Sequence, residues 1–437
     1  MKKFTLTLVL ACIGVAMAAQ TVTTNWSFCN ANGNPPTFPG FDEITLLENS
    51  TRHLAVGTVN GHDGVFVIST AGDVPNVFIY NSSDGKDVGV VDGTSEFWGL
   101  GSPVSLKVND GGVTEDGKIL VNNIVMSGNF KVYKWESETA MINPKVVINY
   151  NFYSGRYGDN VTYTGNYNTG TAKIYAVNKV SGSTKVLCWS MVPDTDNPGT
   201  YKFNNTPAEL FDVVANNSNP GVGLKPDGGF YFKDGGLQIV EYSSTGTLLN
   251  TSPASVVSAS GHTVRYIGKE GADEFIAYFK YSLTETTAET AQENVDILKV
   301  PGGDLSKAVL VATTPSLGTA ANPNGSGDVS VRRVGKNVEI FVISATNGFG
   351  KYTVANVFSQ TPMENIEKDN VKILNQSNIL LVEGDNISGI EVYNALGQMV
   401  KYQSNNYDVK VGDLKGIYIV KVKVGGQLAK IAKVIIK

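Results

Sequence analysis

The chain of 437 residues is poor in the residue types on which most metal sites and catalytic triads depend. It holds 3 Cys and 3 His, and neither type occurs at a metal-binding spacing. None of the three histidines stands beside a nucleophile motif such as G-x-S-x-G. The sequence therefore predicts no catalytic residue, no metal site and no cofactor.

Long apolar runs are also missing, apart from one near the N-terminus. Two lysines precede an apolar run from Phe4 to Val15, and the small residues of 16–19 follow. This order predicts a signal peptide over 1–19, cleaved after Ala18 or Ala19. The alternatives are a buried helix or a lipoprotein signal acylated at Cys12, although the apolar run continues past that residue. No other stretch approaches the ~18 apolar residues of a membrane helix, so we predict an exported chain without a transmembrane segment.

The two cysteines beyond this segment are Cys29 and Cys188. They are far apart in the sequence and give no disulfide framework. They form either one disulfide or two separate small buried side chains.

Strongly basic stretches are absent from the body of the chain. The net charge is −5, yet residues 370–437 hold nine Lys against five acidic residues. The preceding body is therefore acidic, which argues against nucleic acid as a partner because phosphate binding needs clustered Lys and Arg.

Helical periodicity is lacking, and short alternating apolar runs separated by turns with Gly, Asn or Asp take its place. β-branched and aromatic residues dominate these runs, which predicts an all-β body. The clearest runs are 64–68, 76–80, 118–121, 130–135, 145–148, 173–177, 186–189, 229–232, 237–240, 275–278, 295–300 and 338–342.

The runs fall into groups of four, for example 104–108, 118–121, 130–135 and 145–148. Repeated four-stranded units over 20–360 predict a β-propeller of six blades, or seven if a weak blade lies in 190–225. Two stacked sandwich domains and a β-helix are the alternatives. The last group has three clear strands, and residues 21–26 could supply the fourth and close the ring. Residues 361–369 are predicted to be a linker.

Candidate ligand-binding residues lie mainly in one Gly-rich segment. Arg156, Tyr157 and Asp159 stand just before a strand rich in Tyr and Thr, where a propeller's innermost strand would begin and face the funnel. The alternative is an Arg–Asp pair that only fastens neighbouring blades. Trp98 lies in a Gly-rich loop, where an exposed ring could stack on a sugar. The many Asp-Gly and Asn-Gly pairs indicate hairpin turns rather than calcium loops.

The C-terminal segment 370–437 has three motifs of its own, and they predict a small β-sandwich. They are Val392-Tyr393-Asn394 with Gly397, Leu414-Lys415-Gly416-Ile417-Tyr418, and Lys433-Val434-Ile435-Ile436-Lys437. On these residues the segment resembles the type A C-terminal sorting domain of the type IX secretion system of Bacteroidetes. The resemblance implies passage across the outer membrane by that machinery, followed by release or surface attachment. Its implied sorting residues are Val392, Tyr393, Asn394, Gly397, Gly416, Tyr418, Lys433 and Lys437.

The body resembles an uncharacterised family of secreted Bacteroidetes proteins, a domain of unknown function. The resemblance rests on residues 155–159 and 171–176 and implies no catalytic residues. We therefore expect an exported binding protein for a glycan or a protein. A glycan hydrolase or lyase whose acids converge only in the fold is the first alternative. A structural surface-layer or adhesion protein is the second.

Overall fold

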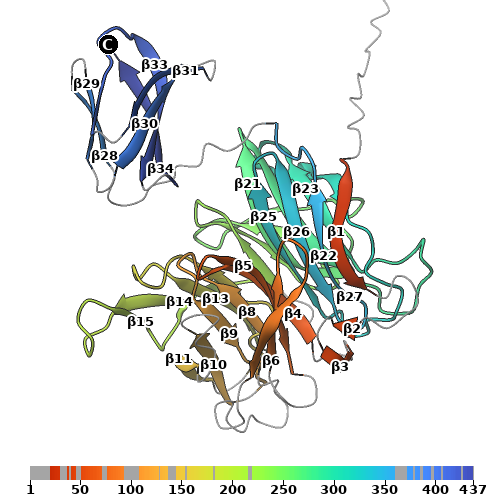
Figure 1. Cartoon of the computed structure of the whole chain (residues 1–437). Coiled ribbons are helices and arrows are strands. Elements are labelled where there is room, and N and C mark those ends of the chain that lie inside the picture. Colours follow the sequence, from red (N-terminus) through yellow and green to blue (C-terminus); the bar gives the residue numbers. More distant parts are fainter. Residues whose placement is uncertain are drawn as a thin grey trace, which may run out of the picture. The chain divides into compact units, whose positions relative to one another are not determined.

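The computed structural model (Figure 1) divides the chain into two compact units, Met1–Gln360 and Thr361–Lys437. Within the described residues no helix is long and apolar enough to span a membrane. The structure describes residues 20–29, 37–38, 41–45, 51–70, 76–92, 108–126, 128–135, 144–152, 155–180, 183–214, 219–359, 372–376, 379–383, 387–394, 398–404, 407–424 and 427–436.

The described part of the first unit contains six antiparallel sheets of four or five strands, besides the two-stranded pair β2 (Thr37–Phe38) and β3 (Phe41–Thr45). Sheet 1 holds β4 (Thr51–Val59), β5 (His62–Ser69), β6 (Asn76–Asn81) and β7 (Asp87–Asp92). Sheet 2 holds β8 (Asp110–Val113), β9 (Ile119–Asn122), β10 (Gly128–Trp135) and β11 (Lys145–Phe152). Sheet 3 holds β12 (Thr162–Thr164), β13 (Lys173–Val180), β14 (Ser183–Pro193), β15 (Tyr201–Phe203) and β16 (Ala208–Asp212).

The other three sheets complete the unit. Sheet 4 holds β17 (Gly221–Leu224), β18 (Phe230–Lys233), β19 (Val240–Tyr242) and β20 (Leu248–Thr251). Sheet 5 holds β21 (Gly261–Glu270), β22 (Asp273–Lys280), β23 (Asn294–Val300) and β24 (Val309–Thr313). Sheet 6 holds β25 (Gly327–Val334), β26 (Asn337–Ser344), β27 (Gly348–Val354) and β1 (Val22–Cys29).

Apolar side chains fill the space between each pair of neighbouring sheets. One buried cluster joins sheets 1 and 2, the next joins sheets 2 and 3, and the series continues until a sixth joins sheet 6 to sheet 1. The first strands contact one another in the same cyclic order, which is β4, β8, β12, β17, β21 and β25. The unit is therefore propeller-like, with sheets packed face to face around the strands that begin them.

Sheet 6 is completed by the N-terminal strand. β1 pairs antiparallel with β27, from Val22 opposite Val354 to Cys29 opposite Gly348. The prediction that residues 21–26 supply the missing strand is confirmed. Gly348 has a φ of 122°, and a Cβ there would lie 2.1 Å from the carbonyl oxygen of Phe28. A glycine is thus required where the two strands start to pair.

Two predicted strands differ from the observed ones. Sheet 2 begins with β8 at Asp110 rather than with the run 104–108, of which residues 104–107 lie outside the described residues. The run 237–240 was predicted as a strand, but β19 starts only at Val240. In the residues before it, the turn Asp234–Leu237 is closed by a backbone hydrogen bond of 3.2 Å.

Cys29 and Cys188 are free thiols, because β1 and β14 belong to different sheets. Each thiol lies 3.7 Å from the hydroxyl of a serine two residues away on its own strand, Ser27 and Ser190 respectively. Of the two alternatives, the disulfide is wrong: the cysteines are separate, with Cys188 buried and Cys29 half-buried.

The second unit consists of two antiparallel sheets around one core. The first sheet holds β28 (Lys372–Gln376), β29 (Ile379–Glu383) and β32 (Asp408–Lys410). The second holds β31 (Met399–Ser404), β30 (Ile387–Tyr393), β33 (Gly416–Val424) and β34 (Gln427–Ile436). Side chains of both sheets, among them Leu380 and Val420, share one buried cluster. This unit therefore has its own hydrophobic core.

Candidate functional site

Polar side chains gather where the first strands of the sheets begin. Most of these residues are buried, although they directly precede or open strands whose next residues are apolar. Because the first strands run side by side, such residues from distant parts of the sequence meet at one end of the inner strands. They include Arg52, His53, Asn109, Asp110, Asp159, Asn160, His262, Thr263, Ser326 and Asp328.

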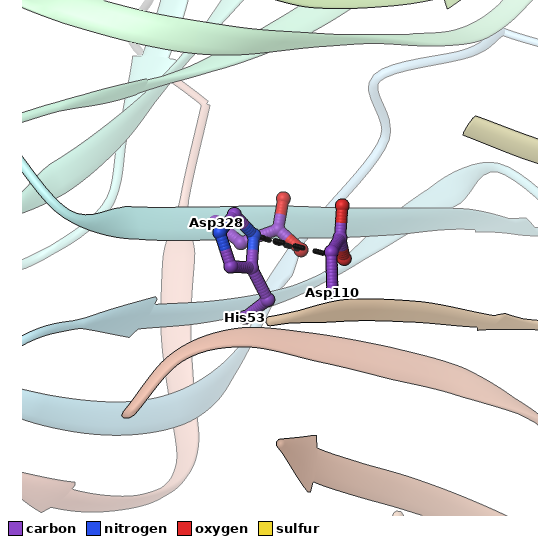
Figure 2. Close-up of side chains that lie close together, drawn as sticks. All are labelled: His53, Asp110 and Asp328. Carbon is purple, nitrogen blue, oxygen red and sulfur yellow. Dashed lines mark ion pairs between the residues drawn. The ribbon is translucent and has the colours of Figure 1, made fainter. Parts of the chain in front are cut away.

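Three of them form a compact group, in which one ring nitrogen of His53 faces two carboxylates (Figure 2). His53 Nδ1 is 3.6 Å from Asp110 Oδ1 and 3.8 Å from Asp328 Oδ2. The exposed fractions of the three side chains are 4%, 0% and 1%. One ligand-type atom from each residue lies within 4.8 Å of the other two. The group is drawn from β4, β8 and β25, so it joins sheets 1, 2 and 6.

Backbone and side-chain donors hold both carboxylates in place. Asp110 accepts hydrogen bonds from Gly111 N at 2.7 Å and Val161 N at 2.6 Å. Asp328 Oδ1 accepts from Val329 N at 2.8 Å and from Arg265 Nη2 at 3.0 Å. By contrast, the buried Nδ1 of His53 has no hydrogen-bond partner. The oxygens are oriented, and the nitrogen between them is left unsatisfied.

The two carboxylates differ in their electrostatic surroundings. Burial raises the pKa of Asp110, and the neighbouring charge of Asp328 adds to this rise while His53 opposes it. Burial also acts on Asp328, but there Arg265 and His53 outweigh it and hold the pKa of Asp328 below its usual value. Asp328 is thus the carboxylate whose negative charge is already balanced by a cation.

Arg52 fastens the same three sheets a short distance away. Its Nε and Nη2 donate to Ser326 Oγ at 3.0 and 2.9 Å, and its Nη1 donates to Asn109 Oδ1 at 3.4 Å. Burial lowers the pKa of Arg52 to about 10, which leaves it cationic at neutral pH. These hydrogen bonds connect the start of β4 to the residues that precede β8 and β25.

The residues predicted to bind a ligand lie close to this polar end. Arg156 forms a two-point ion pair with Asp159, with Nε to Oδ2 at 2.7 Å and Nη2 to Oδ1 at 2.6 Å. Tyr157 is 1% exposed and packs near Phe130. Trp98 lies outside the described residues. Arg156 and Asp159 satisfy each other three residues apart in one segment, so this ion pair does not itself join two blades. A role for these residues in ligand binding remains a prediction.

The other tryptophans are buried. Trp135 and Trp189, predicted to belong to the core, are 1% and 0% exposed, which confirms that prediction. Trp26 is 8% exposed.

The body holds two cavities of interest: one lies along the first strands, and the other lies toward the end of sheet 2 opposite to Asp110. A small one of about 180 Å³ is lined by residues of the first strands, including Thr162, Tyr163, Arg265, Tyr266 and Ser330. A larger one of about 750 Å³ lies between sheet 2 and the hairpin of β14 and β15 in sheet 3. We call the larger cavity the sheet 2–3 groove. It is lined by Lys134, Lys145, Val146, Val147, Tyr167, Asn168, Asp194, Asn197, Gly199, Thr200, Tyr201, Lys202 and Phe203.

The sheet 2–3 groove combines aromatic rings with polar groups. The Lys134 ammonium lies 4.2 Å from the centre of the Tyr167 ring, and Phe203 meets that ring edge-on. Tyr201 is partly exposed and covers Gly170, where a Cβ would come within 2.2 Å of the Tyr201 ring. Lys202 contacts Asp194 at 2.8 Å. The volume of the sheet 2–3 groove falls in the range typical of small-molecule sites.

A buried lysine elsewhere in the body should make the free energy of unfolding depend on pH. Lys233, at the end of β18, is 0% exposed. Its Nζ donates to the carbonyl oxygens of Asp234, Leu237, Ala259 and Gly261 at 2.6–3.3 Å. Burial lowers the pKa of Lys233 to about 7. In the unfolded chain the pKa of a lysine is about 10.4.

Between about pH 7 and pH 10 the unfolded state therefore binds more protons at Lys233 than the folded state does. The free energy of unfolding should rise with pH across this window, and Lys233→Met should lack that contribution. We expect the stability difference between wild type and Lys233→Met to widen from pH 7 to pH 9 in urea titrations. Lys336→Met, on the exposed β25–β26 turn, is the control. An unchanged difference would mean that Lys233 stays protonated when folded.

No family model and no curated protein matches the sequence. Among solved structures, a DUF4623 family protein from Bacteroides eggerthii is similar, at 14% identity over 77% of each chain with a TM-score of 0.56. A DUF4221 family member from Bacteroides vulgatus gives 10% identity over 77% of this chain and 98% of its own, with a TM-score of 0.38. A glycosyl hydrolase from Bacteroides ovatus gives 11% over 79% and 96%, with a TM-score of 0.36. The first similarity shows a shared fold.

Sequence reasoning missed the group of His53, Asp110 and Asp328 and the sheet 2–3 groove. One feature of the sequence could have indicated this group of three residues. A buried polar residue opens the first strand of several sheets, as Asp110 opens β8. The three residues are separated by more than fifty positions, so no local motif marks them. The groove depends on the length of β14, which continues far enough to pair with both β15 and β16.

Proposed function

We propose that this chain is an exported binding protein whose body is a closed six-bladed propeller and whose ligand is a glycan held in the sheet 2–3 groove. The observation that carries the proposal is the groove itself. It places Tyr201 and Tyr167 beside the amide, hydroxyl and ammonium groups of Asn197, Thr200 and Lys145. Sugar rings offer apolar faces and hydroxyl edges, and they need aromatic and polar partners together.

The groove favours binding over hydrolysis. A glycosidase needs two carboxyl groups facing each other across the scissile bond, typically about 5–10 Å apart. Among the described residues that line the groove, only Asp194 is acidic, and Lys202 pairs with it. Asp110 and Asp328 are close to each other, but they are buried and lie outside the lining of both cavities. A hydrolase or lyase remains the alternative, and a structural surface protein is the second.

We further propose that residues 1–19 direct export and that residues 370–437 direct passage through the type IX secretion machinery. Two of the sorting residues lie on β30 (Val392, Tyr393), two on β33 (Gly416, Tyr418) and Lys433 on β34. Asn394 directly follows β30, and its side chain bonds to Gln398. Gly397 and Lys437 lie outside the described residues. The product would be released or held at the cell surface.

A glycan array with the mature protein tests the binding proposal. We expect Tyr201→Ala to weaken the best glycan's affinity about tenfold, which corresponds to roughly 1.4 kcal/mol of lost stacking. The matched control is Tyr266→Ala, which removes another partly exposed tyrosine from the small cavity and should leave affinity unchanged. Binding to no glycan, or loss of binding only in Tyr266→Ala, would contradict the proposal. Capture of a surface protein through Tyr201 instead would identify a protein ligand.

A further inference from the structure

We propose that His53, Asp110 and Asp328 form a binding site for one divalent transition-metal ion. The inference is independent of the ligand proposed for the sheet 2–3 groove. It starts from the unsatisfied His53 Nδ1, which belongs to a side chain only 4% exposed and points between two carboxylates. A buried polar atom without a partner costs free energy. A cation that accepts its lone pair would remove that cost.

The distances fit metal ligands better than a direct ion pair. A protonated imidazole would be expected to donate to a carboxylate at about 2.7–2.9 Å, yet the two separations are 3.6 and 3.8 Å. Around an ion with bonds of about 2.1 Å, neighbouring ligand atoms lie roughly 3.0–3.5 Å apart. The two nitrogen–oxygen separations need to shorten by only a few tenths of an ångström.

The ligand types indicate the class of ion. One imidazole nitrogen with two carboxylate oxygens suits Zn²⁺, Mn²⁺ or Fe²⁺, whereas Ca²⁺ and Mg²⁺ prefer sites made of oxygen alone. Both carboxylates can ligate the ion, and the charge of Asp328 is shared with Arg265. Both are held by other groups, Asp110 by the amides of Gly111 and Val161, and Asp328 by Arg265. Such supports orient ligands before a metal binds.

A metal ion at this site would connect the first and last sheets of the body. His53 comes from sheet 1, Asp110 from sheet 2 and Asp328 from sheet 6. A bound ion would therefore link the first, second and last sheets. Three protein ligands leave coordination positions for water, so the described residues provide an incomplete shell.

Metal uptake by the full mature chain tests the proposal. The protein is stripped with chelator and checked for its folded circular-dichroism spectrum. It is then incubated separately with Zn²⁺, Mn²⁺ and Ca²⁺, and passed through gel filtration before elemental analysis. We expect one equivalent of Zn²⁺ or Mn²⁺ per chain and a melting temperature raised by a few degrees. Failure of the folded apo protein to retain either ion, or retention of Ca²⁺ in preference to both, would overturn the proposal.

Variants locate the ion. We expect Asp110→Asn and His53→Gln to lower the affinity at least tenfold, as is typical when a ligand is lost. Asp328 is left intact because it also pairs with Arg265. Asp296→Asn is the control, since Asp296 is equally buried but pairs with Lys280 at 2.9 Å. Equal retention by Asp110→Asn and wild type would reject the site.

If a variant fails to fold, the wild-type protein can still test whether these residues bind the ion. Its Co²⁺ form should show X-ray absorption of one imidazole with carboxylate oxygens, and a shell without nitrogen would refute the assignment.

Discussion

A chain that ends at residue 369 is expected to be made and folded but to remain in the periplasm. The reason is that each of the two units has its own hydrophobic core. The second unit has its own core, in which Val392 and Val420 are fully buried, and the first unit ends at Gln360. Removing the second unit therefore takes away the proposed sorting signal without opening the body. The full-length protein should reach the surface or the medium, so we expect its extracellular fraction to fall more than tenfold on truncation.

Cell fractionation followed by immunoblotting measures this change, in a Bacteroidetes host that has the secretion machinery. A reporter that carries the signal peptide and residues 361–437, without the body, should be exported. A point variant in the tail sharpens the test. Gly416 opens β33 with a φ of 114°, which a β-branched residue tolerates poorly, so Gly416→Val should reduce export. Unchanged export of the truncated chain would be falsifying for the sorting role.

Replacing Trp26 by alanine is expected to cost about 3–5 kcal/mol of unfolding free energy, the usual range for a buried tryptophan. Trp26 lies on β1 and is 8% exposed. Its Nε1 donates to the carbonyl oxygen of Ser82 at 3.1 Å, and its ring lies 5.8 Å from those of Phe28 and Phe349. One side chain thus anchors β1 to its own sheet and to the loop after β6 in sheet 1.

Urea unfolding followed by intrinsic fluorescence and circular dichroism measures the loss. Thr24→Ala is the matched control, because Thr24 is exposed on the same strand and should change stability by less than about 0.5 kcal/mol. A loss below 1 kcal/mol for Trp26→Ala would show that β1 contributes little to the body. Equal losses in both variants would assign the effect to the strand's backbone pairing rather than to the ring.

Most strands of the body could be predicted because their pattern is local. Val65–Ile68 and Ile340–Val342, for example, are β-branched and aromatic runs bounded by turns, and each is part of an observed strand. Even the long-range pairing of β1 followed from a sheet that was one strand short. Short strands with polar ends were less predictable. The sequence of β8, Asp-Gly-Gly-Val, has little strand propensity, and packing against β4 and β12 decides its position.

The candidate sites could be predicted only in part. The segment around Arg156 was expected at the start of an inner strand, and it does lie there, just before β12. That Arg156 and Asp159 bind each other depends on the turn geometry of residues 155–160, which the sequence alone leaves open. The proximity of His53 to Asp110 and Asp328 depends on which first strands are neighbours. That is a property of the whole ring and no stretch of residues encodes it alone.

The pairing of β1 with β27 also determines the order in which the body can fold. Asn25 bonds to Thr353, 328 residues further along the chain. The first strand to be synthesised must therefore wait, unpaired, until nearly all the rest of the body has been made. Contacts this distant carry a large loop-closure cost and slow folding. Completion of the body therefore comes late in synthesis, and until β27 has been made β1 is an unpaired strand in need of protection.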